Sequence, residues 1–203
     1  MIKLQINDKE FNIVNSYEEL TLGQYIDIIN VSESKVSNSI DNDIKIISAL
    51  SNNKEELNSI LWDFNTEEFD ELKEEFKWVE DNADVLNEFK SLEPKESLEI
   101  EGKKYGIISN YNKMSMGEIV SFESLMKSAS SDFHRLEIAF GILIRPLDSN
   151  NNVVSFTEEI FLDVIRNKYN IKMSEVYSTL SFFLSGDKIS TIKNTKRFSI
   201  QKD

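Results

Sequence analysis

Apolar and polar side chains alternate in two separate segments of the chain, and a two-residue polar turn interrupts each alternation. Alternation with a period of two on both sides of such a turn is typical of an antiparallel β-hairpin. The pattern therefore predicts one hairpin near the start of the chain and another near its middle. The segments are residues 4–13, with Asn7 and Asp8 at the turn, and residues 98–107, with Glu101 and Gly102 at the turn.

A capping box follows each predicted hairpin. Thr21 stands three residues before Gln24, and Ser115 stands three residues before Glu118. In such a box the hydroxyl accepts a hydrogen bond from the third amide of a helix, and the Gln or Glu side chain accepts one from the amide of the cap residue. Apolar residues then recur at the three- and four-residue spacing of one helix face. We therefore expect a helix to begin directly after each box.

The hairpins and boxes belong to a longer internal repeat, because residues 4–28 align without gaps on residues 98–122. The offset of 94 residues is too long for one unit of a solenoid. We interpret the repeat as a duplicated module with pseudo-twofold symmetry; convergence on a common hairpin–helix pattern is the alternative. The identical pairs are Leu4 and Leu98, Ile6 and Ile100, Lys9 and Lys103, Ile13 and Ile107, Tyr17 and Tyr111, and Gly23 and Gly117.

The paired glycines fall in the first turn of the two expected helices, where glycine costs about 1 kcal/mol relative to alanine. No lysine follows either glycine as it does in a phosphate-binding loop. Gly23 and Gly117 therefore predict close backbone packing against the hairpin and no phosphate site.

Most of the remaining chain has helical periodicity, and Pro94 separates the two halves. We therefore predict a mostly helical α+β fold made of two hairpin–helix modules with helical extensions. The modules span residues 1–94 and 95–186, and a basic tail spans residues 187–203. The further helices are expected over residues 43–50, 53–64, 66–89, 133–144, 157–169 and 174–184.

The net charge of −13 is concentrated in residues 54–99, which hold 16 acidic side chains and five lysines. Such a run is typical of a solvated helix face, and a docking surface for a basic partner is the alternative. A strongly acidic chain argues against direct nucleic-acid binding. The runner-up function that follows is an acidic decoy that occupies a nucleic-acid-binding protein.

Residue usage excludes several kinds of chemistry. The chain has no cysteine and a single histidine, His134, so disulfides, thiolate zinc sites, cysteine nucleophiles and His-rich metal clusters are excluded. No run of 18 apolar residues indicates a membrane-spanning helix, and the first residues do not resemble a signal peptide, so we expect the protein to stay in the cell that makes it. We expect no cofactor. An enzyme with a carboxylate-based site is the least favoured function and would need a concave pocket with convergent carboxylates.

One segment has the spacing of a calcium-binding loop. Asp148, Asn150, Asn152 and Glu159 fall at positions 1, 3, 5 and 12 of such a loop. Position 6 is Val153, however, where the sharp turn requires glycine. The segment is also a good polar turn after a proline, so we predict a turn and no metal site.

Two motifs resemble proteins of known class. The hairpin followed by Leu-Thr-Leu-Gly-Gln-Tyr-Ile over residues 6–26, repeated over residues 100–120, resembles tail-assembly and virion proteins of large tailed bacteriophages, including crAss-like phages. The ending Ser-Phe-Phe-Leu-Ser-Gly over residues 181–186 is similar to that of some tail-assembly chaperones. The resemblance implies a non-enzymatic assembly or structural role, with other phage proteins as partners. It also implies a location in the host cytoplasm during assembly or in the virion.

Candidate partner-binding residues lie at the end of the chain. The last expected helix carries aromatic side chains on more than one face, and the basic tail has the charge to contact an acidic partner. Phe182 lies outside the apolar stripe of that helix, which leaves docking or burial between two neighbouring elements open. An oligomer is also left open. The candidates are Tyr177, Phe182, Phe183, Lys193, Lys196 and Arg197.

Overall fold

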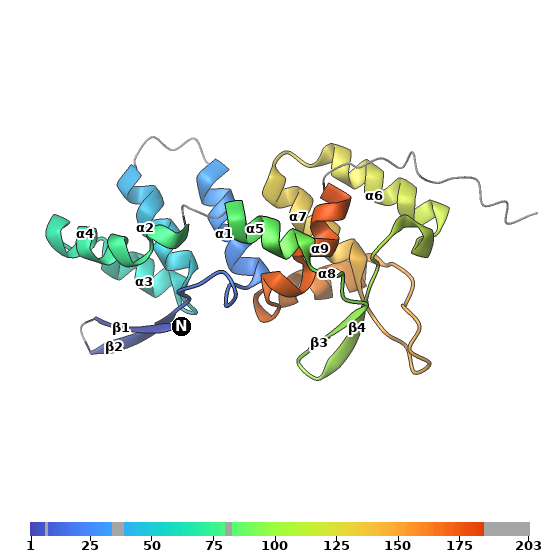
Figure 1. Ribbon diagram of the computed structural model, residues 1–203, viewed down its shortest axis with the longest axis horizontal. Coiled ribbons are helices and arrows are strands. Elements are labelled where there is room, and N and C mark those ends of the chain that lie inside the picture. The colour runs from blue at the N-terminus through green and yellow to red at the C-terminus, as the bar shows by residue number, and fades with distance from the viewer. Residues whose placement is uncertain (7, 34–38, 80–82, 185–203) are drawn as a thin grey trace, which may run out of the picture.

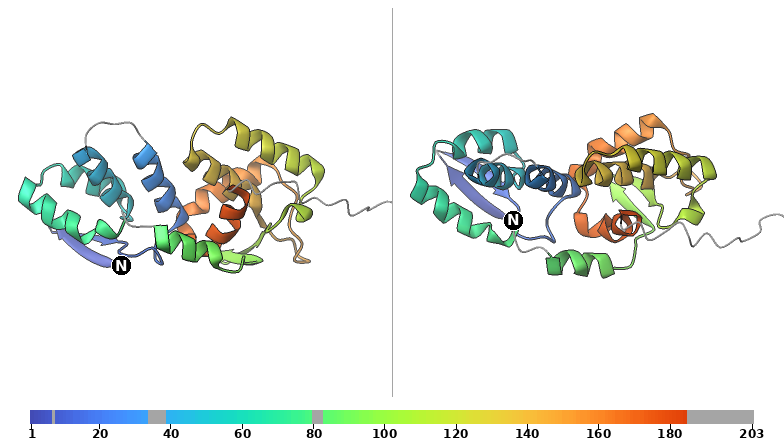
Figure 2. Two further views of the ribbon diagram at one scale, coloured as in Figure 1. Left: turned by 45° about the horizontal axis from the view of Figure 1, so that its top comes forward. Right: turned by 90° about the horizontal axis from the view of Figure 1, so that it is seen from above.

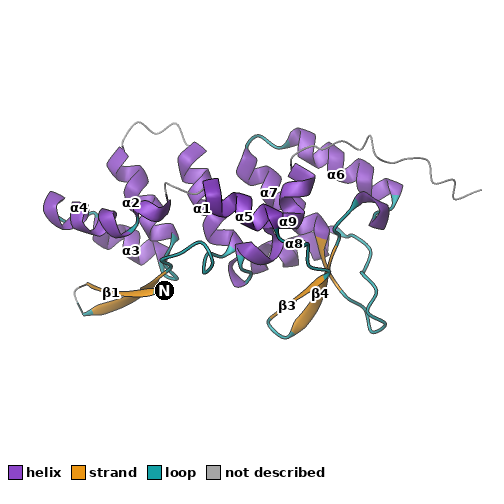
Figure 3. Cartoon of the chain, in the orientation of Figure 1, coloured by secondary structure: helices purple, strands orange, loops and turns teal. Residues whose placement is uncertain are grey.

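The computed structural model describes residues 1–6, 8–33, 39–79 and 83–184. Two groups of helices lie side by side along the longest axis of the molecule, and a β-hairpin projects from each group on the same side (Figure 1). Helices make up most of the fold and the strands form two small antiparallel sheets (Figure 3). The prediction of a mostly helical α+β fold is confirmed.

The first half consists of a hairpin followed by helices. In the hairpin Leu4 lies opposite Phe11, and Asp8 in the turn has a φ of 63°. The elements are β1 (Ile2–Ile6), β2 (Lys9–Ile13), α1 (Leu22–Glu33), α2 (Ser39–Ala49), α3 (Lys54–Leu61), α4 (Thr66–Glu75) and the 3-10 turn η1 (Lys77–Val79).

The second half repeats this order and adds a strand after its second helix. Glu101 and Gly102 both have positive φ, 49° and 78°, which is the backbone of a type I′ hairpin turn. The elements of the second half are β3 (Ser97–Ile100), β4 (Lys103–Ile107), the 3-10 turn η2 (Tyr111–Lys113), α6 (Met116–Ser128), α7 (Asp132–Leu143), β5 (Ile144–Pro146), α8 (Glu158–Arg166), the 3-10 turn η3 (Asn167–Asn170) and α9 (Met173–Leu184). A separate helix, α5 (Ala83–Ser91), precedes them.

Equivalent positions of the repeat have equivalent structure. Leu98 lies opposite Tyr105, at the same register as Leu4 and Phe11 in the first hairpin. Helices α1 and α6 begin at matching positions, and both capping boxes form, with the cap amide 3.1 Å from the Gln24 side-chain oxygen in α1 and 2.7 Å from the Glu118 carboxylate in α6. Duplication of an ancestral module remains an interpretation of this match.

The prediction of one long helix over residues 66–89 is wrong, because the structure divides this segment into three elements. Helix α4 ends at Glu75, η1 follows, and α5 begins at Ala83. The Tyr17 hydroxyl donates a 2.8 Å hydrogen bond to the Val79 carbonyl, and the Trp78 ring packs edge-on against Tyr17 at 5.0 Å. These contacts with a distant segment hold the chain in a turn where the local pattern alone favours a helix.

The core continues from one half into the other through α1, which packs against α7 and η3 (Figure 2). The Leu22 amide donates to the Ile171 carbonyl at 2.9 Å, and the Met173 amide donates to the Leu20 carbonyl at 2.9 Å. Helix α5 precedes Pro94 in the sequence but packs against α9. Among the described residues, no helix has both the length and the apolar character needed to cross a membrane.

Candidate functional site

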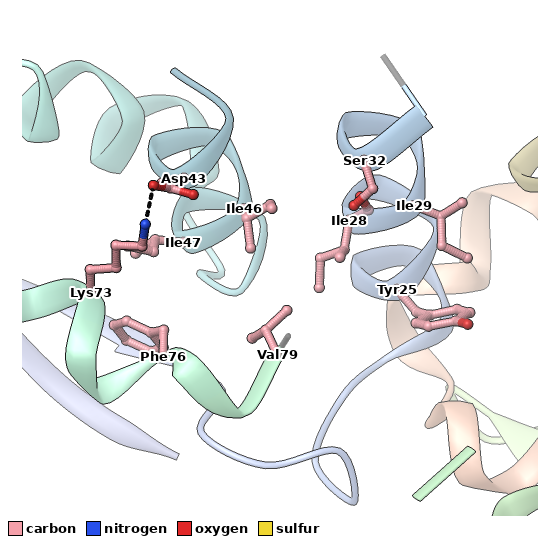
Figure 4. A pocket seen from close by; sticks show the side chains of 10 residues that line it. All are labelled: Tyr25, Ile28, Ile29, Ser32, Asp43, Ile46, Ile47, Lys73, Phe76 and Val79. Carbon is pink, nitrogen blue, oxygen red and sulfur yellow. Dashed lines mark hydrogen bonds and ion pairs between the residues drawn. The ribbon is translucent and has the colours of Figure 1, made fainter. Parts of the chain in front are cut away.

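A groove opens between α1 and α2, and Phe76 and Val79 line its base (Figure 4). Its volume is about 280 Å³, and most of the side chains around it are apolar. The lining residues are Tyr25, Ile28, Ile29, Ser32, Asp43, Ile46, Ile47, Lys73, Phe76 and Val79.

Helical periodicity places these side chains in the groove. From α1 they come at positions i, i+3, i+4 and i+7 beginning at Tyr25, and from α2 at positions i, i+3 and i+4 beginning at Asp43. Figure 4 shows Ile28 and Ile46 on the facing sides of the groove, with Val79 between them near the base. The apolar stripes of two helices therefore line one groove.

The polar groups of the groove are already occupied within the chain. Lys73 forms an ion pair with Asp43 at one rim (Figure 4). The Ser32 hydroxyl donates to the Ile28 carbonyl at 2.9 Å. Burial, together with the neighbouring Tyr177 hydroxyl, raises the pKa of Tyr25 well above its usual value, so Tyr25 stays protonated. The groove therefore offers chiefly apolar contact.

The second half fills the corresponding space with its own side chain. Phe122, the counterpart of Ile28 in the repeat, packs against Phe183 with ring centres 5.6 Å apart. Phe183 also packs against Tyr111 at 4.7 Å. In the first half Trp78 covers Tyr17, the counterpart of Tyr111, while Ile28 still lines the groove. Among the described residues of the first half, no aromatic ring takes the place beside Ile28 that Phe183 takes beside Phe122.

The candidate residues at the end of the chain lie in different places. Phe183 is 3% exposed and belongs to the core, as its position in the apolar stripe requires. Tyr177 is half-buried and packs edge-on against Tyr25 at 6.1 Å, at the contact between the two halves. The structure does not bring these two residues together on one exposed surface. The Phe182 side chain and Lys193, Lys196 and Arg197 lie outside the described residues.

The acidic side chains of α4 cover its solvent-facing side. Six of the ten residues of this helix are acidic and all six are exposed, whereas Phe69 on the opposite side is buried. Asn65 caps the helix in a capping box with Glu68. This distribution is the ordinary one for a solvated amphipathic helix.

The calcium-like segment is a closed turn. The Asp148 carboxylate accepts 2.8 Å hydrogen bonds from the amides of Asn150 and Asn152, and these bonds lower its pKa. Asn151 has a φ of 60°, which completes the turn. No group of three or more Asp, Glu or His side chains in the described parts of the chain is arranged to hold a metal ion.

A buried ion pair in the second half was not expected from the sequence. Arg145 is 2% exposed, bonds to the Ile142 carbonyl at 2.8 Å and pairs with Glu118 of the capping box. Burial alone would raise the pKa of Glu118, but hydrogen bonds from Ser115 and Arg145 lower it to about 2. In the first half the neutral Gln24 makes the corresponding connection, donating to the Leu50 carbonyl at 2.9 Å. The sequence shows that Glu118 replaces Gln24 at the equivalent position of the repeat, but it does not show that Arg145 is the partner of Glu118.

The groove was also not identified from the sequence. Ile28, Ile46 and Ile47 have the spacing of core positions, and Ile28 and Ile47 are buried, but that spacing does not show that they border a groove. Comparisons with protein-family models, with curated proteins and with solved structures found no match to this chain.

Proposed function

We propose that the chain is a non-enzymatic assembly protein of a tailed bacteriophage, similar in role to a tail-assembly chaperone, and that it acts through protein–protein contacts. The observation that carries the proposal is the apolar groove between α1 and α2, whose polar groups are already bonded within the chain. The resemblance of residues 6–26 and 100–120 to phage assembly proteins supplies the biological setting.

The groove favours side chains of another protein over a small ligand. Its volume of about 280 Å³ lies just below the range of about 300–1,000 Å³ that is typical of small-molecule sites. An amphipathic helix can place apolar side chains at i, i+3 and i+4 in such a groove. The exposed acids of the nearby α4 would favour a segment with flanking basic residues by steering its approach.

The location of the chain gives the first test. We expect mass spectrometry to find it in tail-assembly intermediates isolated from the host cytoplasm, or in purified particles of the phage that encodes it. Its presence at a stoichiometry comparable with other tail components supports the proposal. Its absence from both intermediates and particles contradicts it.

A groove variant gives the second test. Ile46→Glu places a charge among apolar side chains at the groove, so we expect it to reduce the yield of complete tails. Leu162→Glu is the matched control, because Leu162 is 46% exposed on α8, outside the groove. Both variants must keep the wild-type circular dichroism spectrum. Equal tail yields for both variants would contradict a role for the groove.

A further inference from the structure

Helix α6 exposes an apolar face that its counterpart α1 buries. Leu22 and Ile26, the first and fifth residues of α1, are 0% and 2% exposed. Met116 and Val120, the first and fifth residues of α6, are 69% and 61% exposed. The two helices share a hairpin register and a capping box, so the difference comes from what covers them. We call the surface formed by Met116, Gly117 and Val120 the α6 face.

A segment of the second half covers the equivalent face of α1. The Tyr169 ring lies directly over Gly23, so close that an added Cβ would be 2.4 Å from the ring. The Tyr169 hydroxyl donates to the Asp27 carboxylate at 3.0 Å. A backbone hydrogen bond of 2.9 Å joins Leu22 to Ile171. An aromatic ring packed on a glycine is therefore part of the contact between the halves.

The same seat on α6 is open within the described chain. Apart from the neighbouring residues and the backbone of α6, no described atom lies within 4 Å of the place where a Cβ of Gly117 would stand. Ser121 occupies the position that corresponds to Asp27 and is exposed. The α6 face is thus built like the buried face of α1, but nothing in the described chain occupies it.

The matching aromatic ring is present at the other end of the molecule. Tyr169 stands four residues before the first residue of α9, and Trp62 stands four residues before the first residue of α4. Trp62 is 52% exposed and borders a surface hollow of about 350 Å³ that Phe64 also lines. Figure 1 places α4 and α6 at opposite ends of the long axis.

We propose that copies of this chain associate head to tail, with Trp62 of one copy seated on Gly117 of the next, between Met116 and Val120. The contact repeats between molecules the one that Tyr169 and Gly23 make within each molecule. Because the two surfaces differ and lie at opposite ends, the association is heterologous and produces chains or rings. The contact joins copies of this chain, so it is independent of a role in phage assembly.

Sedimentation velocity over a range of concentrations tests the contact. We expect the wild type to associate as concentration rises, and Trp62→Ala and Met116→Glu each to weaken association by about tenfold or more, as loss of a central anchor does. Both side chains are more than half exposed, and an acid in the first turn of a helix is favourable, so both variants should fold. Leu162→Glu, an equally drastic change at an exposed apolar residue on α8, should associate like the wild type.

Mixing the two variants tests the head-to-tail arrangement. Trp62→Ala keeps the α6 face and Met116→Glu keeps Trp62, so an equimolar mixture has one intact contact and should form 1:1 dimers that do not grow. A wild type that stays monomeric up to about 1 mM would overturn the proposal. Variants that associate like the wild type, or a mixture that forms no dimer, would overturn it as well.

Discussion

Two glycines at equivalent positions of the repeat have opposite surroundings. Gly23 lies under the Tyr169 ring, so Gly23→Ala forces the ring away and should lower the melting temperature. The prediction of close packing is wrong for Gly117, because no described atom outside its own helix segment lies near its Cβ position. Gly117→Ala should therefore raise the free energy of unfolding by up to about 1 kcal/mol through helix propensity. Thermal and urea denaturation of the two variants measure both effects. Equal effects of the two substitutions would show that the glycines are not packed differently.

A second residue-scale prediction concerns pH and Glu118. Its pKa in the folded chain is about 2, below the usual 4.5, so its bonds to Ser115 and Arg145 stabilise the fold above pH 4.5. That contribution is lost as the pH falls from 4.5 towards 2. We expect Glu118→Gln to cost about 1.5–3 kcal/mol at pH 7, the range for hydrogen bonds to charged groups.

Urea denaturation at several pH values measures the loss. The difference in stability between wild type and Glu118→Gln should shrink as the pH falls below 4.5. A difference that stays constant from pH 7 to pH 2 would contradict the role of the charge.

At the scale of elements, the turn at η1 depends on a contact with the first half of the chain. Tyr17→Phe keeps the edge-on packing with Trp78 and removes the hydrogen bond to the Val79 carbonyl. The carbonyl is then left without this donor, so we expect a loss of about 1 kcal/mol in the free energy of unfolding. Thermal denaturation checks this, and an unchanged melting temperature would mean that packing alone holds the turn.

Elements that depend on neighbouring residues could be predicted from the sequence. The two hairpins and the starts of α1 and α6 follow from turn residues and capping boxes, which act within a few positions. The break between α4 and α5 could not be predicted, because it depends on Tyr17, about 60 residues away in the chain. The buried pair of Glu118 and Arg145 could not be predicted for the same reason.

The groove, too, could be predicted only in part from the sequence. The apolar stripes that line the groove are readable as periodicity in α1 and α2. Whether a stripe is covered depends on a distant segment: Phe183 closes the space beside Phe122, whereas no equivalent ring closes the space beside Ile28 within the described residues. The sequence therefore predicts which side chains line the groove, but it does not predict that the groove is open.

At the scale of the whole molecule, the second half packs a tyrosine ring on α1, whereas no described residue packs on the corresponding face of α6. Leu22 and Met116 have the same place in the repeat and read alike as core positions, yet only Leu22 is buried. The difference arises because the second half covers α1, while no described segment covers the corresponding face of α6. In the proposed head-to-tail association, a second copy of the chain supplies the missing cover.

Photo-crosslinking from position 62 tests this association most directly. The photoreactive residue p-benzoylphenylalanine in place of Trp62 keeps an aromatic ring at the contact, and mass spectrometry identifies the peptide to which it attaches. We predict covalent dimers in which the attachment lies in residues 116–121 of the second copy. Attachment at any other surface, or no covalent dimer in a sample that associates, would contradict the head-to-tail contact.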